Sequence, residues 1–183
     1  MGTYSSALAC PECLKRKNSN QSKSSLKNQS SSKFGYIISS DIKELEAKWK
    51  CTNCTYSISS DKVTELTLKI KEESNNLEEQ CWGHSSISES KPNGGISIQK
   101  HEEFLAKHEN ISLHPNHVFL IDKKYTLAKM YGRMAGYEAD ILTDDQHRRK
   151  KKLCEDVLSV FDKIMPGRQR KRGNNISTCL KSY

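Results

Sequence analysis

Two Cys-x-x-Cys pairs are the feature that most constrains the fold of this 183-residue chain. They lie in LACPEC at 8–13 and in WKCTNC at 49–54. Two residues between cysteines let the backbone turn, so that both sulfurs face the same ion. Two such pairs complete a tetrahedral shell with no open position, which is typical of structural rather than catalytic zinc. The pattern therefore predicts a structural zinc site, with these four ligands: Cys10, Cys13, Cys51 and Cys54.

The segment between the two pairs is long for a zinc ribbon, where roughly 15 to 20 residues are usual. Within it, residues 18–32 are almost entirely Ser, Asn, Gln and Lys, which is the composition of a disordered insertion. Doubling a flexible loop costs only about 0.6 kcal/mol, against roughly 10 to 16 kcal/mol from a structural zinc ion. We expect a disordered insertion over 16–33, flanked by short strands at 34–38 and 49–51. Residues 1–58 are thus predicted to form a zinc ribbon.

The cysteines have other possible interpretations. With no secretion signal, seven cysteines favour metal ligands or free thiols over a disulfide framework. Reduced thiols in a frayed terminus are the alternative to zinc, and a thioredoxin-like role is disfavoured because no βαβ pattern surrounds either pair. Cys154 lies on an apolar helical stripe and is predicted to be a buried thiol. Cys81 and Cys179 have no partner at metal spacing and are interpreted as free thiols.

The rest of the chain shows the spacing of amphipathic helices. LHPNH at 113–117 places Pro115 where the first turn of a helix accepts a proline. TDDQ at 143–146 matches a capping box. The predicted helices cover about 61–79, 97–109, 115–132 and 143–164. We expect a mainly α fold in which a connecting helix (59–79) and a linker (80–96) lead to tetratricopeptide-like antiparallel helices over 97–167.

Charge and hydropathy limit the partners. The net charge of +8 is concentrated in RRKKK at 148–152 and RQRKR at 168–172. We interpret the first as a solvated helix face and the second as part of a disordered basic tail over 168–183; contact with nucleic acid is possible but not favoured. No apolar run approaches the roughly 20 residues of a membrane span, and no signal peptide pattern is present. The expected location is intracellular, in the nucleus or cytoplasm, with a protein partner and no membrane.

Catalytic motifs are absent from the sequence. It has no Gly-rich cofactor loop, no Gly-x-Ser-x-Gly and no HExxH, so we predict no catalytic and no cofactor-binding residue. His114 and His117 are three residues apart and could hold a metal, but nothing nearby completes a ligand set. Capping and packing are the favoured roles for both. Composition and motifs together indicate a zinc-stabilised binding or structural module.

Several strings resemble a known family. GTY at 2–4, SALACPEC at 6–13 and WKCTNC at 49–54 are similar to the post-SET zinc region of arthropod SET and MYND domain proteins. LHPNH, Tyr131-Gly132 and the helix from Lys152 to Pro166-Gly167 resemble the helical C-terminal domain of that family. Together these matches run from about residue 2 to residue 172, interrupted by the Ser/Asn-rich insertion.

This resemblance implies a zinc-bound post-SET segment followed by tetratricopeptide-like helices, in proteins classed as S-adenosylmethionine-dependent protein-lysine methyltransferases. It implies the same four zinc ligands and no catalytic residue, because the SET and MYND motifs would lie before Met1. The expected function is therefore the C-terminal portion of such a protein, bracing a substrate cleft and inactive by itself. A truncated gene model or isoform is the first explanation, and an authentic short protein is the second. A stand-alone zinc-binding adaptor for protein or nucleic acid is the alternative function.

Overall fold

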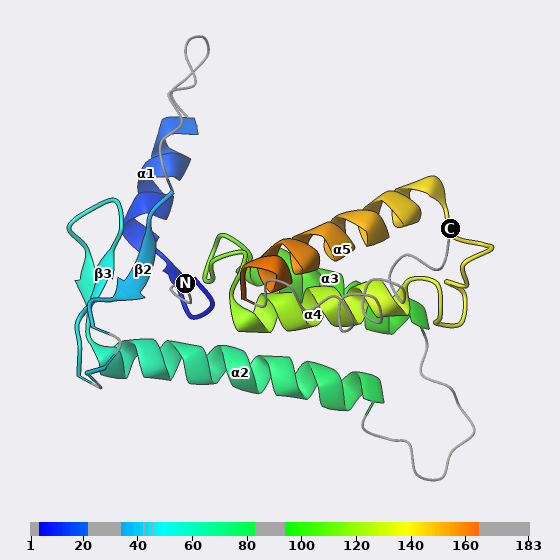
Figure 1. The fold of residues 1–183 in the computed structure, drawn as a ribbon, viewed down its shortest axis with the longest axis horizontal. Helices are drawn as coiled ribbons and strands as arrows, with labels where there is room; N and C mark the ends of the chain where they lie inside the picture. Colours follow the sequence, from blue (N-terminus) through cyan, green and yellow to red (C-terminus); the bar gives the residue numbers. More distant parts are fainter. Residues whose placement is uncertain (1–3, 22–33, 42, 45, 83–93, 165–183) are drawn as a thin grey trace. The chain divides into compact units, whose positions relative to one another are not determined.

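The computed structural model describes residues 4–21, 34–82 except 42 and 45, and 94–164. Its contacts divide the chain into two compact groups. The first, here called the ribbon unit, comprises residues 2–71 and 107–117. The second, here called the helical unit, comprises 72–106 and 118–183. Figure 1 shows the elements of both.

A four-stranded antiparallel sheet forms the centre of the ribbon unit. Its strands follow chain order: β1 (Leu8–Ala9), β2 (Tyr36–Ser39), β3 (Trp49–Cys51) and β4 (Ser57–Ile58). Ile37 is paired with Leu8 on one side and with Cys51 on the other. This register places the second cysteine pair at the end of β3, with only β2 between it and β1, the strand that precedes the first pair. The short strand expected at 49–51 is confirmed, and the strand expected at 34–38 is present but spans Tyr36–Ser39.

Helix α1 (Pro11–Gln21) follows β1 directly and was not expected. The disordered insertion was predicted to begin at residue 16, but residues 16–21 continue this helix. Its start has clear physical causes, because Pro11 needs no N–H partner in a first turn and Glu12 favours the positive end of the helix dipole. The N–H of Leu14 bonds to the carbonyl of Cys10 at 3.0 Å. The remainder of the expected insertion, 22–33, lies outside the described residues.

The LHPNH string belongs to the ribbon unit and does not begin a helix. Leu113 forms a bridge with Leu8, and the N–H of His114 bonds to the carbonyl of Ala7 at 3.0 Å. A turn follows, closed by a 2.8 Å bond from the N–H of His117 to the carbonyl of His114. The prediction that Pro115 lies in the first turn of a helix is therefore wrong. Backbone pairing with β1 takes up the residues on its N-terminal side, so the next helix starts after the turn.

Four long helices follow the sheet in the chain. They are α2 (Ser60–Trp82), α3 (Gly94–His108), α4 (Val118–Met130) and α5 (Asp144–Ile164). Each overlaps a helix expected from apolar periodicity. Most of the expected linker, 83–93, and the expected basic tail lie outside the described residues. The mainly α character with a small sheet is confirmed, whereas the tetratricopeptide-like arrangement stays a prediction.

Apolar side chains from all four helices form the core of the helical unit, where α4 packs against α5. Those almost fully buried include Leu105, Leu120, Leu127 and Leu153. The start of α5 is a capping box as predicted, because the N–H of Gln146 bonds to Thr143 Oγ1 at 3.3 Å and the N–H of Thr143 bonds to Gln146 Oε1 at 2.9 Å. The buried thiol predicted at Cys154 is confirmed.

Some expected core positions face solvent instead. The apolar spacing of the first and last predicted helices places Leu66 and Ile164 on their buried faces, but Leu66 is 44% exposed and Ile164 is 55% exposed. Lys150 belongs to the run that was interpreted as a solvated helix face, but it is buried, and so are Lys123 and Lys124. Lys123 pairs with Glu78, and Lys124 pairs with Asp156 at 2.9 Å. Periodicity ranks a residue by its polarity, so it does not find a lysine whose charge is matched by a carboxylate from another helix.

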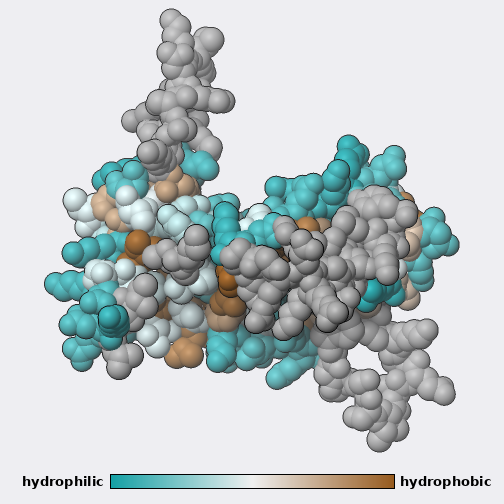
Figure 2. All heavy atoms as spheres, in the orientation of Figure 1, coloured by the Kyte–Doolittle hydropathy of each residue, from teal (hydrophilic) through white to brown (hydrophobic). Residues whose placement is uncertain are grey.

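Three of the five cations in the basic run at 148–152 form ion pairs, and a fourth is buried. Arg148 pairs with Asp145, Arg149 with Glu102 and Lys152 with Asp156, while Lys150 is buried. The visible side of α5 is hydrophilic in Figure 2. Among the helices that the structure describes, none is long and apolar enough to cross a bilayer.

Candidate metal centre

The four predicted ligands come together in the ribbon unit. The Sγ atoms of Cys10, Cys13, Cys51 and Cys54 all lie within 4.8 Å of one another. Cys10 and Cys54 are 3.6 Å apart, and Cys13 and Cys51 are 3.8 Å apart. Four cysteines that are separated in the chain by the whole Ser/Asn-rich segment thus form one compact cluster.

Each pair is placed by a short element of the sheet. Cys10 follows β1 and Cys13 lies in the first turn of α1, whereas Cys51 ends β3 and Cys54 lies in the turn after it. The N–H of Cys10 bonds to the carbonyl of Gly35 at 3.0 Å, which ties the first pair to the segment leading into β2. The N–H of Cys51 bonds to the carbonyl of Tyr56 at 2.9 Å and closes the second turn.

Distances in the cluster fit a tetrahedral metal ion. Zinc–sulfur bonds of about 2.3 Å place the sulfurs of a tetrahedron about 3.8 Å apart, which is close to the 3.6 and 3.8 Å observed. A disulfide would require a separation of about 2.05 Å, and all four thiols are free. The cluster can therefore hold a metal ion such as zinc.

Gly35 is part of the site, although sequence analysis did not select it. A Cβ atom at this position would lie 2.5 Å from Cys51 Sγ and 2.6 Å from Cys13 Sγ. Neither sulfur can move away without leaving the cluster, so this approach of backbone to sulfur requires glycine. An isolated glycine next to a strand often marks such a close approach, and that signal in FGYII could have identified it.

Hydrogen bonds and burial set the protonation of the thiols. Burial raises the pKa of the Cys10 thiol to about 12, and burial also raises the pKa of Cys13. A backbone hydrogen bond from Tyr56 lowers the pKa of Cys54. The N–H of Asn53 also donates to Cys51 Sγ at 3.3 Å. At neutral pH a metal must therefore displace protons from the buried pair, so that binding releases protons.

Other residues considered from the sequence lie apart from this cluster. His114 stacks on Tyr4 with ring centroids 4.6 Å apart, and His117 is 2% exposed. Among the described residues, the only group of His, Cys, Asp or Glu close enough to share a metal is the four-cysteine cluster. Cys81 is buried near the end of α2, and Cys179 lies outside the described residues.

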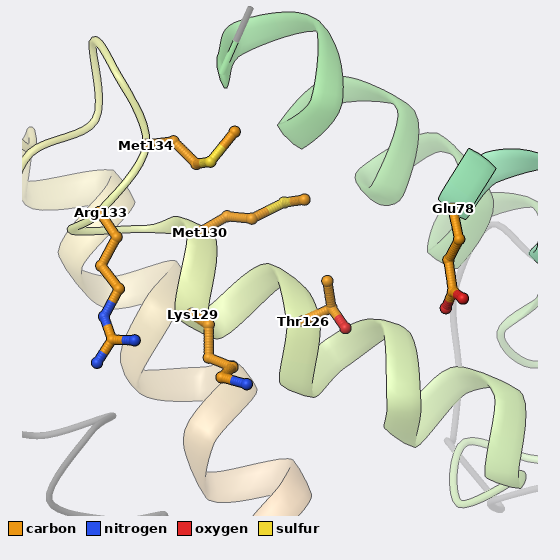
Figure 3. A pocket seen from close by; sticks show the side chains of 6 residues that line it. All are labelled: Glu78, Thr126, Lys129, Met130, Arg133 and Met134. Carbon is orange, nitrogen blue, oxygen red and sulfur yellow. The ribbon is translucent and has the colours of Figure 1, made fainter. Parts of the chain in front are cut away.

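A hollow of about 400 Å³ lies beside α4 in the helical unit. Figure 3 shows the six side chains that line it: Glu78, Thr126, Lys129, Met130, Arg133 and Met134. These residues include no His, Cys or Ser that could act as a nucleophile or a base near neutral pH, and Glu78 is paired with Lys123. The metal cluster is therefore the stronger candidate for the functional site.

Comparisons with protein-family models, with curated proteins and with solved structures each return no match for this chain.

Proposed function

We propose that this chain is a zinc-stabilised scaffold, in which Cys10, Cys13, Cys51 and Cys54 hold one structural zinc ion. The observation that supports this best is the gathering of the four sulfurs within 4.8 Å. Four thiolates fill the tetrahedral shell and leave no position for water or substrate, so the ion would contribute folding energy and not chemistry. The residues around it orient the ligands, as hydrogen bonds around a metal shell generally do.

The ribbon unit has a physical need for such an ion. Its fully described strands contain two to four residues each, and its most deeply buried side chains include small ones such as Ala7 and Ala9. A core of this kind removes little apolar surface from water, and small units of this kind commonly depend on a metal or on disulfides.

For its biological role, we propose the C-terminal portion of a SET and MYND-type protein-lysine methyltransferase-like protein. The ribbon would brace one wall of a substrate cleft, and helices in a tetratricopeptide-like arrangement would frame another. Support comes from the resemblance in both cysteine pairs and in LHPNH, and from the pairing of that string with β1 beside the cysteines. S-adenosylmethionine would bind to the SET core of the parent protein and not to this chain.

The zinc proposal is tested by metal analysis of the purified chain. We expect one zinc per chain, and a loss of bound zinc in Cys51→Ser, because serine is a poor zinc ligand. Cys81→Ser is the matched control, since it also changes a buried thiol but lies in α2 away from the cluster. A zinc content near zero in the reduced, unsubstituted chain would contradict the proposal.

A separate experiment tests the biological role. The transcript should encode a SET and MYND region in frame before Met1, and the purified chain should transfer no methyl group from S-adenosylmethionine to lysine. An upstream sequence without that region would exclude the methyltransferase role while leaving the zinc site unaffected. Lysine methylation by the chain alone would show that catalytic residues are present here after all.

The alternative of an adaptor that binds nucleic acid through residues 148–152 has less support. Arg148, Arg149 and Lys152 already form ion pairs with carboxylates within the helical unit. Binding phosphate there would require breaking these pairs.

A further inference from the structure

A continuous row of aromatic rings lies in the ribbon unit. The ring centroids of Phe34 and Tyr36 are 5.1 Å apart, those of Tyr36 and His114 are 4.2 Å apart, and those of His114 and Tyr4 are 4.6 Å apart. The four rings come from three separate stretches of the chain, so tertiary structure alone brings them together. None of these four rings belongs to the cysteine cluster.

Hydrogen bonds hold two of the four rings, Tyr36 and His114, in place. The hydroxyl of Tyr36 donates a 2.8 Å hydrogen bond to Asn110 Oδ1, and Asn110 has a left-handed backbone with φ of 59°. The N–H of Asn116 donates to His114 Nδ1 at 2.9 Å, which fixes the ring of His114. A fixed row of rings loses little conformational entropy when a flat ligand stacks on it.

The rings remain accessible. Tyr4 is 47% exposed, and Phe34, Tyr36 and His114 are half-buried. Packing within the ribbon therefore leaves part of the row open to a partner.

Cations border the row. The ammonium group of Lys17 lies 5.6 Å from the centre of the Phe34 ring, and Arg16 precedes it on the exposed part of α1. Lys50 is paired in register with Ile38, which shares the strand face of Tyr36 because side chains alternate along β2. Within the part of the chain that the structure describes, these three cations form no ion pair with a carboxylate. They differ in this from the paired run on α5.

Two carboxylates lie nearby. Glu12 is bound by Lys15 at 2.9 Å. Glu109 precedes Asn110 and is half-buried, and it acts electrostatically on Tyr36. The three cations thus outnumber these two carboxylates, and an anionic partner is favoured.

We propose that this row of rings, with Lys17, Arg16 and Lys50 at its border, binds single-stranded nucleic acid. Unpaired bases stack on aromatic side chains without regard to sequence, while lysine and arginine contact the phosphates between them. Double-stranded nucleic acid keeps its bases stacked on each other and cannot use the rings. The proposal is independent of the methyltransferase role and concerns a different surface from the metal ligands.

The decisive experiment measures binding of a fluorescein-labelled oligouridylate of 12 nucleotides to the zinc-loaded full chain at low salt, by fluorescence anisotropy. Tyr4→Leu removes the most exposed ring but keeps an apolar side chain, and we expect it to weaken binding at least about fivefold, the lower limit for one stacked base. Tyr4→Phe keeps the ring and should bind like the parent. Zinc content is measured for each variant, so that loss of the fold is distinguished from loss of the ring.

A second pair of variants tests the cations. Lys17→Gln should lower the slope of log affinity against log salt by about 0.7, the value for one phosphate of a single strand. Lys62→Gln is the matched control, because Lys62 is an exposed lysine of the same unit on α2. The basic run at 168–172 can bind phosphate by itself, which is why the ring variants and not binding alone decide the question.

Three results would overturn the proposal: equal affinity of Tyr4→Leu and the parent, equal affinity for a duplex of the same length, or complete competition by polyglutamate. The last result would assign the surface to an acidic protein partner. Photocrosslinking of a 5-iodouridine oligonucleotide should in addition label Tyr4, Phe34 or His114, and labelling confined to residues outside the row would also contradict the proposal.

Discussion

The ribbon unit and the helical unit are stabilised by different means. In the helical unit, large side chains such as Leu105, Leu127 and Leu153 are almost completely buried, and burying each one contributes about 1.5 to 3 kcal/mol. The ribbon unit buries fewer large side chains, and its centre contains four sulfurs instead. In the proposed zinc-bound state, the metal would supply in the ribbon unit what apolar packing supplies in the helical unit.

Both units bury polar groups, but they satisfy them differently. The helical unit buries Lys123 and Lys124 against carboxylates. The ribbon unit buries Cys10 beside Cys54 and Cys13 beside Cys51. A buried lysine is matched by the chain itself, whereas a buried thiolate needs an ion from outside. We therefore expect the ribbon unit to respond to removal of the metal and the helical unit to respond to removal of a carboxylate.

Removal of zinc is expected to have the largest effect, and only on the ribbon unit. Chelation should abolish up to roughly 10 to 16 kcal/mol of metal-linked folding energy, so the amide resonances of residues 34–58 should lose their dispersion. Resonances of α4 and α5 should stay in place, because their core contains no metal ligand. Heteronuclear NMR spectra recorded before and after chelation measure this difference. Loss of dispersion in both sets of resonances would contradict the claim that only the ribbon unit depends on zinc.

Substituting one glycine in each unit tests the same difference between the ribbon unit and the helical unit. Gly35→Ala places a methyl group 2.5 to 2.6 Å from two sulfurs and should sharply reduce zinc affinity, measured by competition with a chromophoric chelator. Gly136→Ala, in the helical unit, meets no atom within 4 Å but has φ of +80°, so it should cost about 1 to 2 kcal/mol through backbone strain alone. Its zinc affinity should equal that of the parent, and a similar loss in both variants would refute this explanation.

Removal of one carboxylate tests the charge pairing of the helical unit. Burial would raise the pKa of Asp156, but hydrogen bonds from Lys124 and Lys152 hold it below its usual value. Asp156→Asn removes the ion pair between this carboxylate and the buried ammonium of Lys124. We expect a loss of about 2 kcal/mol, below the 3 to 5 kcal/mol of a fully buried pair because Asp156 is 24% exposed.

Urea unfolding followed by helical circular dichroism measures this loss. Glu155→Gln is the control, since Glu155 is the exposed neighbour of Asp156, and it should be nearly neutral. Zinc content should not change in either variant. A stabilised Asp156→Asn protein would show that the pair does not compensate for the burial of Lys124.

Mild acid should weaken the ribbon unit through His117. Burial, with a smaller contribution from His114, lowers the pKa of His117 to about 4, below the usual value of about 6.5. Between these values the unfolded chain binds the proton and the folded chain does not, so stability falls as the pH decreases below 6.5. At about 1.36 kcal/mol per unit of pKa shift, the expected loss between pH 8 and pH 5 is about 2 kcal/mol.

Protons also compete with zinc for the thiolates, so the informative quantity is a difference between two proteins. The parent should lose about 2 kcal/mol more than His117→Gln over this pH range, measured by hydrogen exchange at amides of the ribbon unit. Equal pH dependence of the two proteins would show that His117 is protonated in the folded state.

Much of the secondary structure and all four cysteines of the cluster were predictable from local patterns. Cysteine spacing identifies ligands because a knuckle is a local turn, and the capping box at Thr143 is likewise a contact between residues close in the chain. The predictions were wrong where a residue far away in the chain determines the local structure. Leu113 and His114 pair with β1 instead of starting a helix.

The order of residues was sufficient to identify the two cysteine pairs that form the cluster, the approximate helices and a mainly α composition, since each depends on spacing within a few turns of chain. Tertiary structure decided which residues surround them. It placed Gly35 against two sulfurs, buried Lys123 beside Glu78 and assembled a row of four rings from three stretches. These features depend on distances between residues far apart in the chain, and no local pattern of side-chain polarity records such distances.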